Sequence, residues 1–167
     1  MALAITGTGN GSLNNLALSA NTGTIVDTGR AGGIIQVAYS ISTTTTTVTN
    51  STSSDVSLHT QTITPSSSSN KILAICTVFG ERNPGLDTKY YYVNLYRDST
   101  KIVTNWGNAM NFRQTNQART HASISYLDSP ATTSEITYKM SGDFSASATS
   151  ATFFVYTKTI TLMEVVA

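Results

Sequence analysis

The chain has few charged residues, one cysteine and no long apolar run, and each shortage narrows the possible functions. Charged residues make up 11% of the 167 positions, against roughly 25% in typical soluble chains. The net charge is only +1. Nucleic acids and anionic membranes select strongly basic surfaces, so we expect neither as a partner.

The single cysteine, Cys76, excludes an intrachain disulfide. It lies inside the apolar run 71–79, where we expect it to be buried as a small hydrophobe rather than exposed as a reactive thiol. No basic-then-apolar leader opens the sequence, and no apolar stretch is long enough to cross a bilayer. We therefore expect synthesis in a reducing cytoplasm.

What the chain does have is serine and threonine, at about 50 positions. Threonine is β-branched and favours strands. Short strand-like runs are separated by Ser, Asn, Gly and Pro at roughly 10-residue spacing, which predicts an all-β domain with about eight strands in a jelly-roll-like antiparallel β-sandwich. The runs are residues 34–41, 56–63, 71–79, 90–96, 102–106, 122–127, 136–140, 152–156 and 159–166, with 43–47 as a further extended strand or edge and 107–119 as a surface loop.

Residues 1–32 differ from the body at 33–167. They are rich in Gly and Asn, and their apolar side chains are too sparse to form a core. We predict that this segment is an extended arm that becomes ordered on a partner surface. The candidate contact residues of the arm are Ile5, Leu13, Leu16, Leu18, Ile25, Val26 and Arg30.

No pattern in the chain assembles the groups of an active site. The glycine cluster at 7–11 lacks the strand and helix of a phosphate-binding loop. His59 and His121 lie far apart and have no spaced partner ligands, so ordinary strand positions explain them. The nine carboxylates are scattered, and Asp98 and Asp128 fall at predicted turns. We expect no catalytic residues, no cofactor and no metal.

The tyrosine cluster allows two interpretations. Tyr90, Tyr92 and Tyr96 share one face of the predicted strand 90–96, and they are either core residues with ordinary cross-strand partners or part of a sugar platform or subunit interface. The run 71–79 is apolar on both faces, which suggests that a neighbouring subunit covers one of them. Ile75 therefore joins these three tyrosines as a candidate interface residue.

Several segments together resemble a family of small virion proteins of tailed bacteriophages that infect cyanobacteria and other aquatic hosts. They include LYRDSTKI at 95–102, ISYLDSPATT at 124–133 and the closing ITLMEV at 160–165, with weaker matches at 33–37, 63–73 and 137–139. The likeness covers about 130 residues of the body. It implies a β-sandwich, a homotrimer and a position on the phage particle, where such proteins serve as capsid decoration proteins or as knobs of tail or neck fibres.

The sequence thus predicts a structural virion protein assembled in the host cytoplasm. The leading hypothesis is a capsid decoration (cement) protein on the outer surface of the particle, with the arm bound to the phage major capsid protein. The alternative is a tail or neck fibre knob that binds host surface glycan through loops 80–88 and 107–119. A third class, a polysaccharide-degrading enzyme, would be tested first at Asp87 and Asp98.

Overall fold

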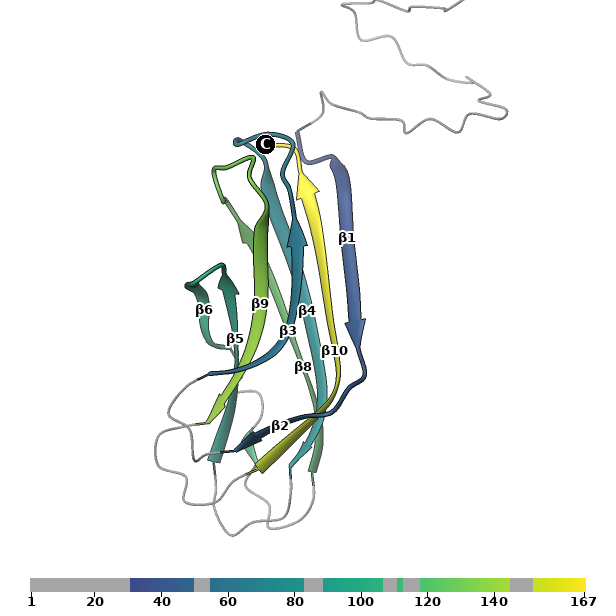
Figure 1. Cartoon of the computed structure of the whole chain (residues 1–167), viewed down its shortest axis with the longest axis vertical. Helices are drawn as coiled ribbons and strands as arrows, with labels where there is room; N and C mark the ends of the chain where they lie inside the picture. The colour runs from purple at the N-terminus through teal and green to yellow at the C-terminus, as the bar shows by residue number, and fades with distance from the viewer. Residues whose placement is uncertain (1–30, 50–54, 83–88, 107–110, 113–117, 145–151) are drawn as a thin grey trace, which may run out of the picture.

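The structure is a computed structural model that describes residues 31–49, 55–82, 89–106, 111–112, 118–144 and 152–167. These residues form strands and connections and contain no helix. Two antiparallel sheets pack face to face (Figure 1). The strands are β1 (Ile34–Ser42), β2 (Thr46–Thr49), β3 (Val56–Ile63), β4 (Lys71–Arg82), β5 (Lys89–Arg97), β6 (Thr100–Trp106), β7 (Asn111–Phe112), β8 (Ala118–Asp128), β9 (Ile136–Phe144) and β10 (Thr152–Val165).

The strand order confirms the predicted jelly-roll-like sandwich. The first sheet runs β1-β10-β4-β8, with β2 added beside β10, and the second runs β3-β9-β5-β6, with β7 beside β5. The eight longer strands are shared between the sheets in the double Greek-key manner of a jelly roll. The fold class is therefore all-β.

The predicted elements differ from the observed ones in three places. Runs 152–156 and 159–166 form the single strand β10. The pairing of β10 with β4 shifts its register between Val155 and Thr157, and the strand continues through this irregularity. The threonine run is divided: Thr46 and Thr47 begin β2, and the residues before them connect it to β1. The predicted surface loop 107–119 was wrong in part, since β7 and the start of β8 fall inside it.

The core lies between the sheets and is made by alternate residues of each strand. In β10, Phe153, Val155, Ile160 and Leu162 are fully buried, while their neighbours lie on the outer side. Burying one such side chain stabilises the fold by about 1.5–3 kcal/mol. Cys76 is also buried here, as predicted, and burial raises the pKa of its thiol to about 12.

An aromatic cluster joins the two sheets near one end of the core, where β5 and β10 begin and β9 ends. The Tyr91 ring from β5 stacks on Phe153 from β10 at a centroid distance of 4.2 Å, and it meets Phe144 edge-on at 5.4 Å. The Tyr91 hydroxyl is buried and has no hydrogen-bond partner within the described residues. It lies against Gly142, where a Cβ atom would overlap it.

The first described residues, which begin at Ala31, lie beside the C-terminal residues in space. The amide of Gly32 donates to the Val166 carbonyl at 2.8 Å, and the amide of Val166 donates to the Gly33 carbonyl at 2.9 Å. Gly32 has a φ of +83°, a backbone conformation that favours glycine. The seven candidate arm residues, Ile5 to Arg30, lie outside the described residues.

We predict that Gly142→Ala destabilises the protein by about 1–3 kcal/mol, because the new methyl group overpacks the core against Tyr91. Tyr91→Phe removes the clashing, unsatisfied hydroxyl, so the same glycine substitution should cost less in that background. Urea unfolding of the two single variants and the double variant measures both costs. Equal costs in the two backgrounds would contradict the predicted contact.

Candidate functional site: polar clusters and outer sheet faces

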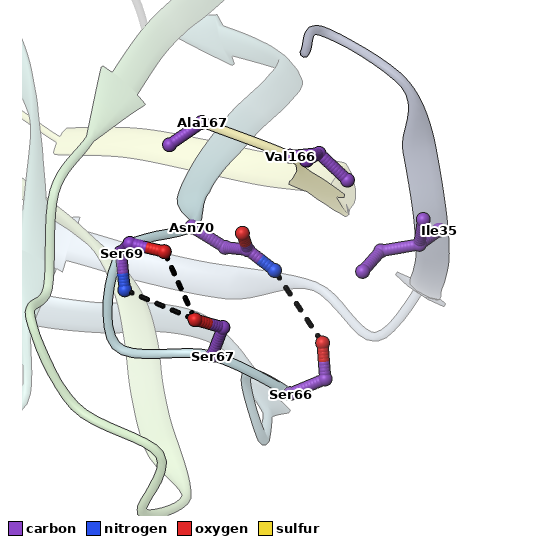
Figure 2. Close-up of a pocket in the computed structure, with 7 residues that line it drawn as sticks. All are labelled: Ile35, Ser66, Ser67, Ser69, Asn70, Val166 and Ala167. Atoms are coloured by element: carbon purple, nitrogen blue, oxygen red, sulfur yellow. Dashed lines mark hydrogen bonds between the residues drawn. The ribbon is translucent and has the colours of Figure 1, made fainter. Parts of the chain in front are cut away.

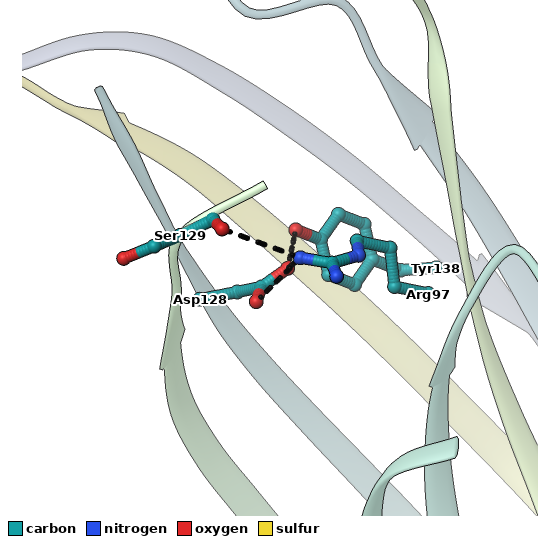
Figure 3. Close-up of polar contacts among 4 residues, drawn as sticks. All are labelled: Arg97, Asp128, Ser129 and Tyr138. Atoms are coloured by element: carbon teal, nitrogen blue, oxygen red, sulfur yellow. Dashed lines mark hydrogen bonds and ion pairs between the residues drawn. The ribbon is translucent and has the colours of Figure 1, made fainter. Parts of the chain in front are cut away.

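A charged cluster ties the two sheets together near the end of β8 (Figure 3). Arg97 of β5 donates from one nitrogen to both carboxylate oxygens of Asp128, each at 3.0 Å, and Tyr138 of β9 donates to the same carboxylate at 2.7 Å. Asp128 is only 5% exposed. Its buried carboxylate therefore links the two sheets through hydrogen bonds. The prediction that Asp128 has only a turn role was wrong.

A second buried carboxylate, Glu164 of β10, is held by neutral donors. It accepts the Ser66 amide at 2.7 Å, the Ser66 hydroxyl at 2.8 Å and the Asn70 side-chain amide at 2.7 Å. Burial alone would raise the pKa of Glu164, but these hydrogen bonds outweigh it and hold the pKa below the usual range. The serine turn between β3 and β4 is thus the polar wall around a buried charge.

An open hollow of about 410 Å³ adjoins this turn, lined by Ile35, Ser66, Ser67, Ser69, Asn70, Val166 and Ala167 (Figure 2). Its serine and asparagine side chains bond to one another: Ser67 and Ser69 hydroxyls lie 2.9 Å apart, and Asn70 donates to Ser66. The polar groups of the hollow are therefore largely engaged in holding the turn.

The threonine run supplies hydrogen-bond acceptors to a buried cation. Lys158 of β10 is 1% exposed, and its ammonium donates to the Thr44 carbonyl and, at 3.1 Å, to the Thr46 hydroxyl. Burial lowers the pKa of Lys158. The segment that links β1 to β2 therefore supplies the oxygen atoms that this cation needs.

The outer face of the second sheet carries paired charges. Asp55 forms a 2.7 Å ion pair with Lys101 and accepts hydrogen bonds from Asn94, at 3.0 Å, and from the Tyr96 hydroxyl. Burial would raise the pKa of Asp55, but Lys101 and Tyr96 outweigh it and lower the pKa. The Lys139 ammonium lies 4.3 Å from the centre of the Tyr96 ring.

The histidines do not form a hydrolytic site in the described structure. His59 Nε2 lies 2.9 Å from the Ser40 hydroxyl, but the charge acting on the ring is the Lys158 ammonium. Burial and that positive charge both lower the pKa of His59. A serine triad needs a carboxylate in this position, so the electrostatics are opposite. His121 is exposed on β8 and packs against Phe79 at 4.6 Å between ring centroids.

Of the two carboxylates singled out for enzyme tests, the structure describes one, Asp98. Asp98 has a φ of +51° in the β5–β6 turn and accepts the Thr137 amide at 3.0 Å, which confirms a turn role. Asp87 lies outside the described residues. Among the residues that the structure describes, no three His, Cys, Asp or Glu side chains gather in a group that could hold a metal.

The described part of the chain also contains no helix that could cross a membrane.

The outer face of the first sheet is largely uncharged, in contrast to the outer face of the second sheet. Between Lys71 at one end and the Glu81–Arg119 ion pair (2.8 Å) at the other, its outward side chains include no Asp, Glu, Lys or Arg. We call this surface the neutral face; it consists of Val37, Tyr39 and Ile41 of β1, Thr157, Thr159, Thr161 and Met163 of β10, Leu73, Ile75, Thr77 and Phe79 of β4, and His121, Ser123, Ser125 and Leu127 of β8.

The four candidate interface residues do not share one surface. Tyr92 and Tyr96 lie on the outer side of β5 in the second sheet, while the inward face of that strand, Tyr91, Val93 and Leu95, is buried. Ile75 lies on the neutral face. Tyr90 belongs to β5, but its side chain lies outside the described part of the structure, as do most residues of the proposed glycan loops.

Sequence reasoning missed most of the neutral face. Only Ile75 was named, although Val37, Tyr39 and Ile41 are each more than half exposed in the monomer. The available signal was the run at 34–41, which is apolar at most positions and carries no charge. An edge strand with that composition is expected to be covered in the assembled molecule.

No family model and no curated protein sequence matches the chain. Among solved structures, it is similar to the VP2 subviral particle of infectious bursal disease virus, with 12% identity and a TM-score of 0.42 over 79% of this chain. It is also similar to the structure of the Gt strain of that virus, with 9% identity and a TM-score of 0.43 over 90% of this chain. The chain spans 37% and 42% of the length of those two chains.

We predict that Glu164→Gln lowers the free energy of unfolding by about 1–3 kcal/mol at neutral pH, because the donors around it lose a charged acceptor. The folded-state pKa is depressed, so the contribution is fully present above the unfolded value of 4.5. It is lost as the pH falls through the folded pKa. Urea unfolding at several pH values should show the gap to the unsubstituted protein closing in acid.

The matched control is Glu135→Gln, which neutralises an exposed carboxylate next to β9. It should change stability by no more than about 0.5 kcal/mol. A gap for Glu164→Gln that stays constant from pH 7 to pH 3 would argue against the stabilised charge.

Proposed function

We propose that the protein is a structural subunit of a virus particle, and specifically a capsid decoration protein of a tailed bacteriophage. The observation that carries this proposal is the neutral face: a broad uncharged surface on a sandwich whose opposite face is charged. Such surfaces mark contacts between proteins. The sequence resemblance to small phage virion proteins points in the same direction.

In this proposal, the body assembles as a homotrimer on the outer shell, and residues 1–32 lie between major capsid proteins. The body has a core of its own, since all its buried apolar side chains in the described residues fall between Val48 and Leu162. In the proposal, residues 1–32 serve as the anchor. Three arms on one trimer would bind together far more tightly than one.

We predict that deleting residues 1–30 leaves the body folded and abolishes binding to capsids. Co-sedimentation with purified shells measures binding, and urea unfolding measures the fold. A matched variant replaces only Leu13, Leu16 and Leu18 with Ser, which keeps the length of the arm and removes apolar contacts. Undiminished binding by the deletion variant would eliminate the arm as the anchor.

A second candidate is a fibre or spike knob that binds host glycan. The favouring observation is the cluster around Tyr96, where an aromatic ring lies among Asp55, Asn94 and Lys139 on the outer face of the second sheet. Aromatic rings and paired polar groups of this kind bind sugars, and lectins are among the proteins with jelly rolls.

The two candidates predict different locations on the particle. Electron microscopy of particles with this subunit labelled would show label on the shell for a decoration protein and on the tail or neck for a knob. We also predict that Tyr96→Ala leaves capsid binding unchanged, whereas a knob would lose glycan binding in an array assay with the same variant.

A further inference from the structure

We propose that the neutral face is the surface through which three copies of this chain pack around a threefold axis, with β1 of one copy beside β8 of the next. This inference deepens the proposed function and rests on its homotrimer. It also places the subunit contact on the side of Ile75 and away from Tyr92 and Tyr96.

The residues of the neutral face form rows that cross all four strands of the first sheet. One row consists of Val37, Met163, Leu73 and Leu127, which are aligned by the pairing of β1, β10, β4 and β8. Val37 is 57% and Leu127 49% exposed in the monomer, so both edges of the row are open to solvent. A monomer would keep this apolar row in water.

The next rows are uncharged and rich in hydroxyl groups. Tyr39 and Ile75 lie in the second row, and in the third the Thr159 and Thr77 hydroxyls bond to each other at 2.6 Å. A hydroxyl pair that is bonded in this way has little need of water. It can therefore be buried at low cost in polar desolvation.

The chemistry of the face favours a second copy of the same chain as the occupant. A charged partner surface would lose its hydration against a face that has no opposite charges to offer. Another neutral face avoids that cost, and a chain with a net charge of only +1 repels its copies little. The outer face of the second sheet, with Asp55, Lys101 and Lys139, does not have this property.

The dimensions of the face suit a threefold arrangement. Four strands spaced by about 4.8 Å make a face about 19 Å wide, and three such faces in a triangle lie about 5.5 Å from the common axis. That distance is close to half the spacing of about 10 Å at which sheets pack face to face. Side chains of ordinary size therefore fill the space around the axis.

The edges of the sheet meet in the same arrangement. Within the described residues, β1 pairs only with β10 and β8 only with β4 in this sheet, so each has one free edge. β1 carries no charged residue and no proline, the usual features that block pairing of edge strands. Rotation by 120° brings β1 beside β8 of the next copy with the strands antiparallel, and three such contacts close the ring.

This arrangement predicts which residues meet between copies. Val37 and Leu127 lie in one row at opposite edges of the sheet, so Val37 of each copy comes close to Leu127 of the next. Charges placed at these two positions should therefore repel or attract each other across the contact. Because both side chains are exposed in the monomer, the substitutions should leave the fold of the single chain intact.

The test uses the full-length chain and sedimentation equilibrium. The unsubstituted protein should have three times the chain mass of 17.8 kDa. Val37→Lys with Leu127→Lys should weaken assembly by a factor on the order of 100 or more, since like charges meet at each contact. Val37→Lys with Leu127→Glu should restore the trimer at low salt, because each Lys then meets a Glu.

The matched control is Thr60→Lys with Thr62→Lys, two exposed strand positions on the outer side of the second sheet. It should remain a trimer. Folding of every variant is checked by the buried Cys76 thiol, which should stay unreactive toward a thiol reagent.

Three results would overturn the inference: a monomeric unsubstituted protein, a Lys–Lys variant that assembles normally, or dissociation of both double variants with no rescue by Glu. A monomeric protein would also remove the homotrimer from the proposed function. The other two results would overturn the inference alone, because they do not involve capsids and label on the shell would still support the proposed function. Conversely, a rescued trimer that is absent from virus particles would overturn the proposed function and leave the inference standing.

Discussion

The register of β10 determines both sides of the first sheet. This 14-residue strand pairs with β1, β2 and β4, so its alternation is imposed on three neighbours. A shift by one residue would exchange the inner and outer sets of side chains. It would move Lys158 and Glu164 out of their buried polar contacts and bring Thr159 and Met163 into the core. The buried charges and the neutral face are therefore two results of one pairing.

Two hydroxyl-rich segments supply partners for charges that the sandwich buries. Glu164 is surrounded by Ser66 and Asn70, and Lys158 is capped by Thr44 and Thr46. A buried charge without such partners would cost several kcal/mol. The segments that read as low-complexity sequence thus supply hydrogen bonds at specific places.

The sequence was informative where one residue and its near neighbours decide the outcome. Strand-like runs at 71–79, 90–96 and 136–140 predicted β4, β5 and β9, and the apolar run around Cys76 predicted its burial. It could not show that Asp128 meets Arg97 and Tyr138, because that contact joins residues of both sheets and depends on the topology. The same limit applies to the neutral face, whose rows combine residues more than 100 positions apart, such as Val37 and Met163.

The two outer faces of the sandwich must therefore be solvated differently. On the second sheet, Asp55 and Lys101 neutralise each other and stay in contact with water, a state that is stable in a single subunit. On the first sheet, Tyr39 and Ile41 gain nothing from water, and the free edge of β1 leaves backbone groups unpaired. Burial of that face removes both costs at once. The proposed contact between bodies and the proposed anchoring by residues 1–32 involve different parts of the chain, so each can be tested without the other.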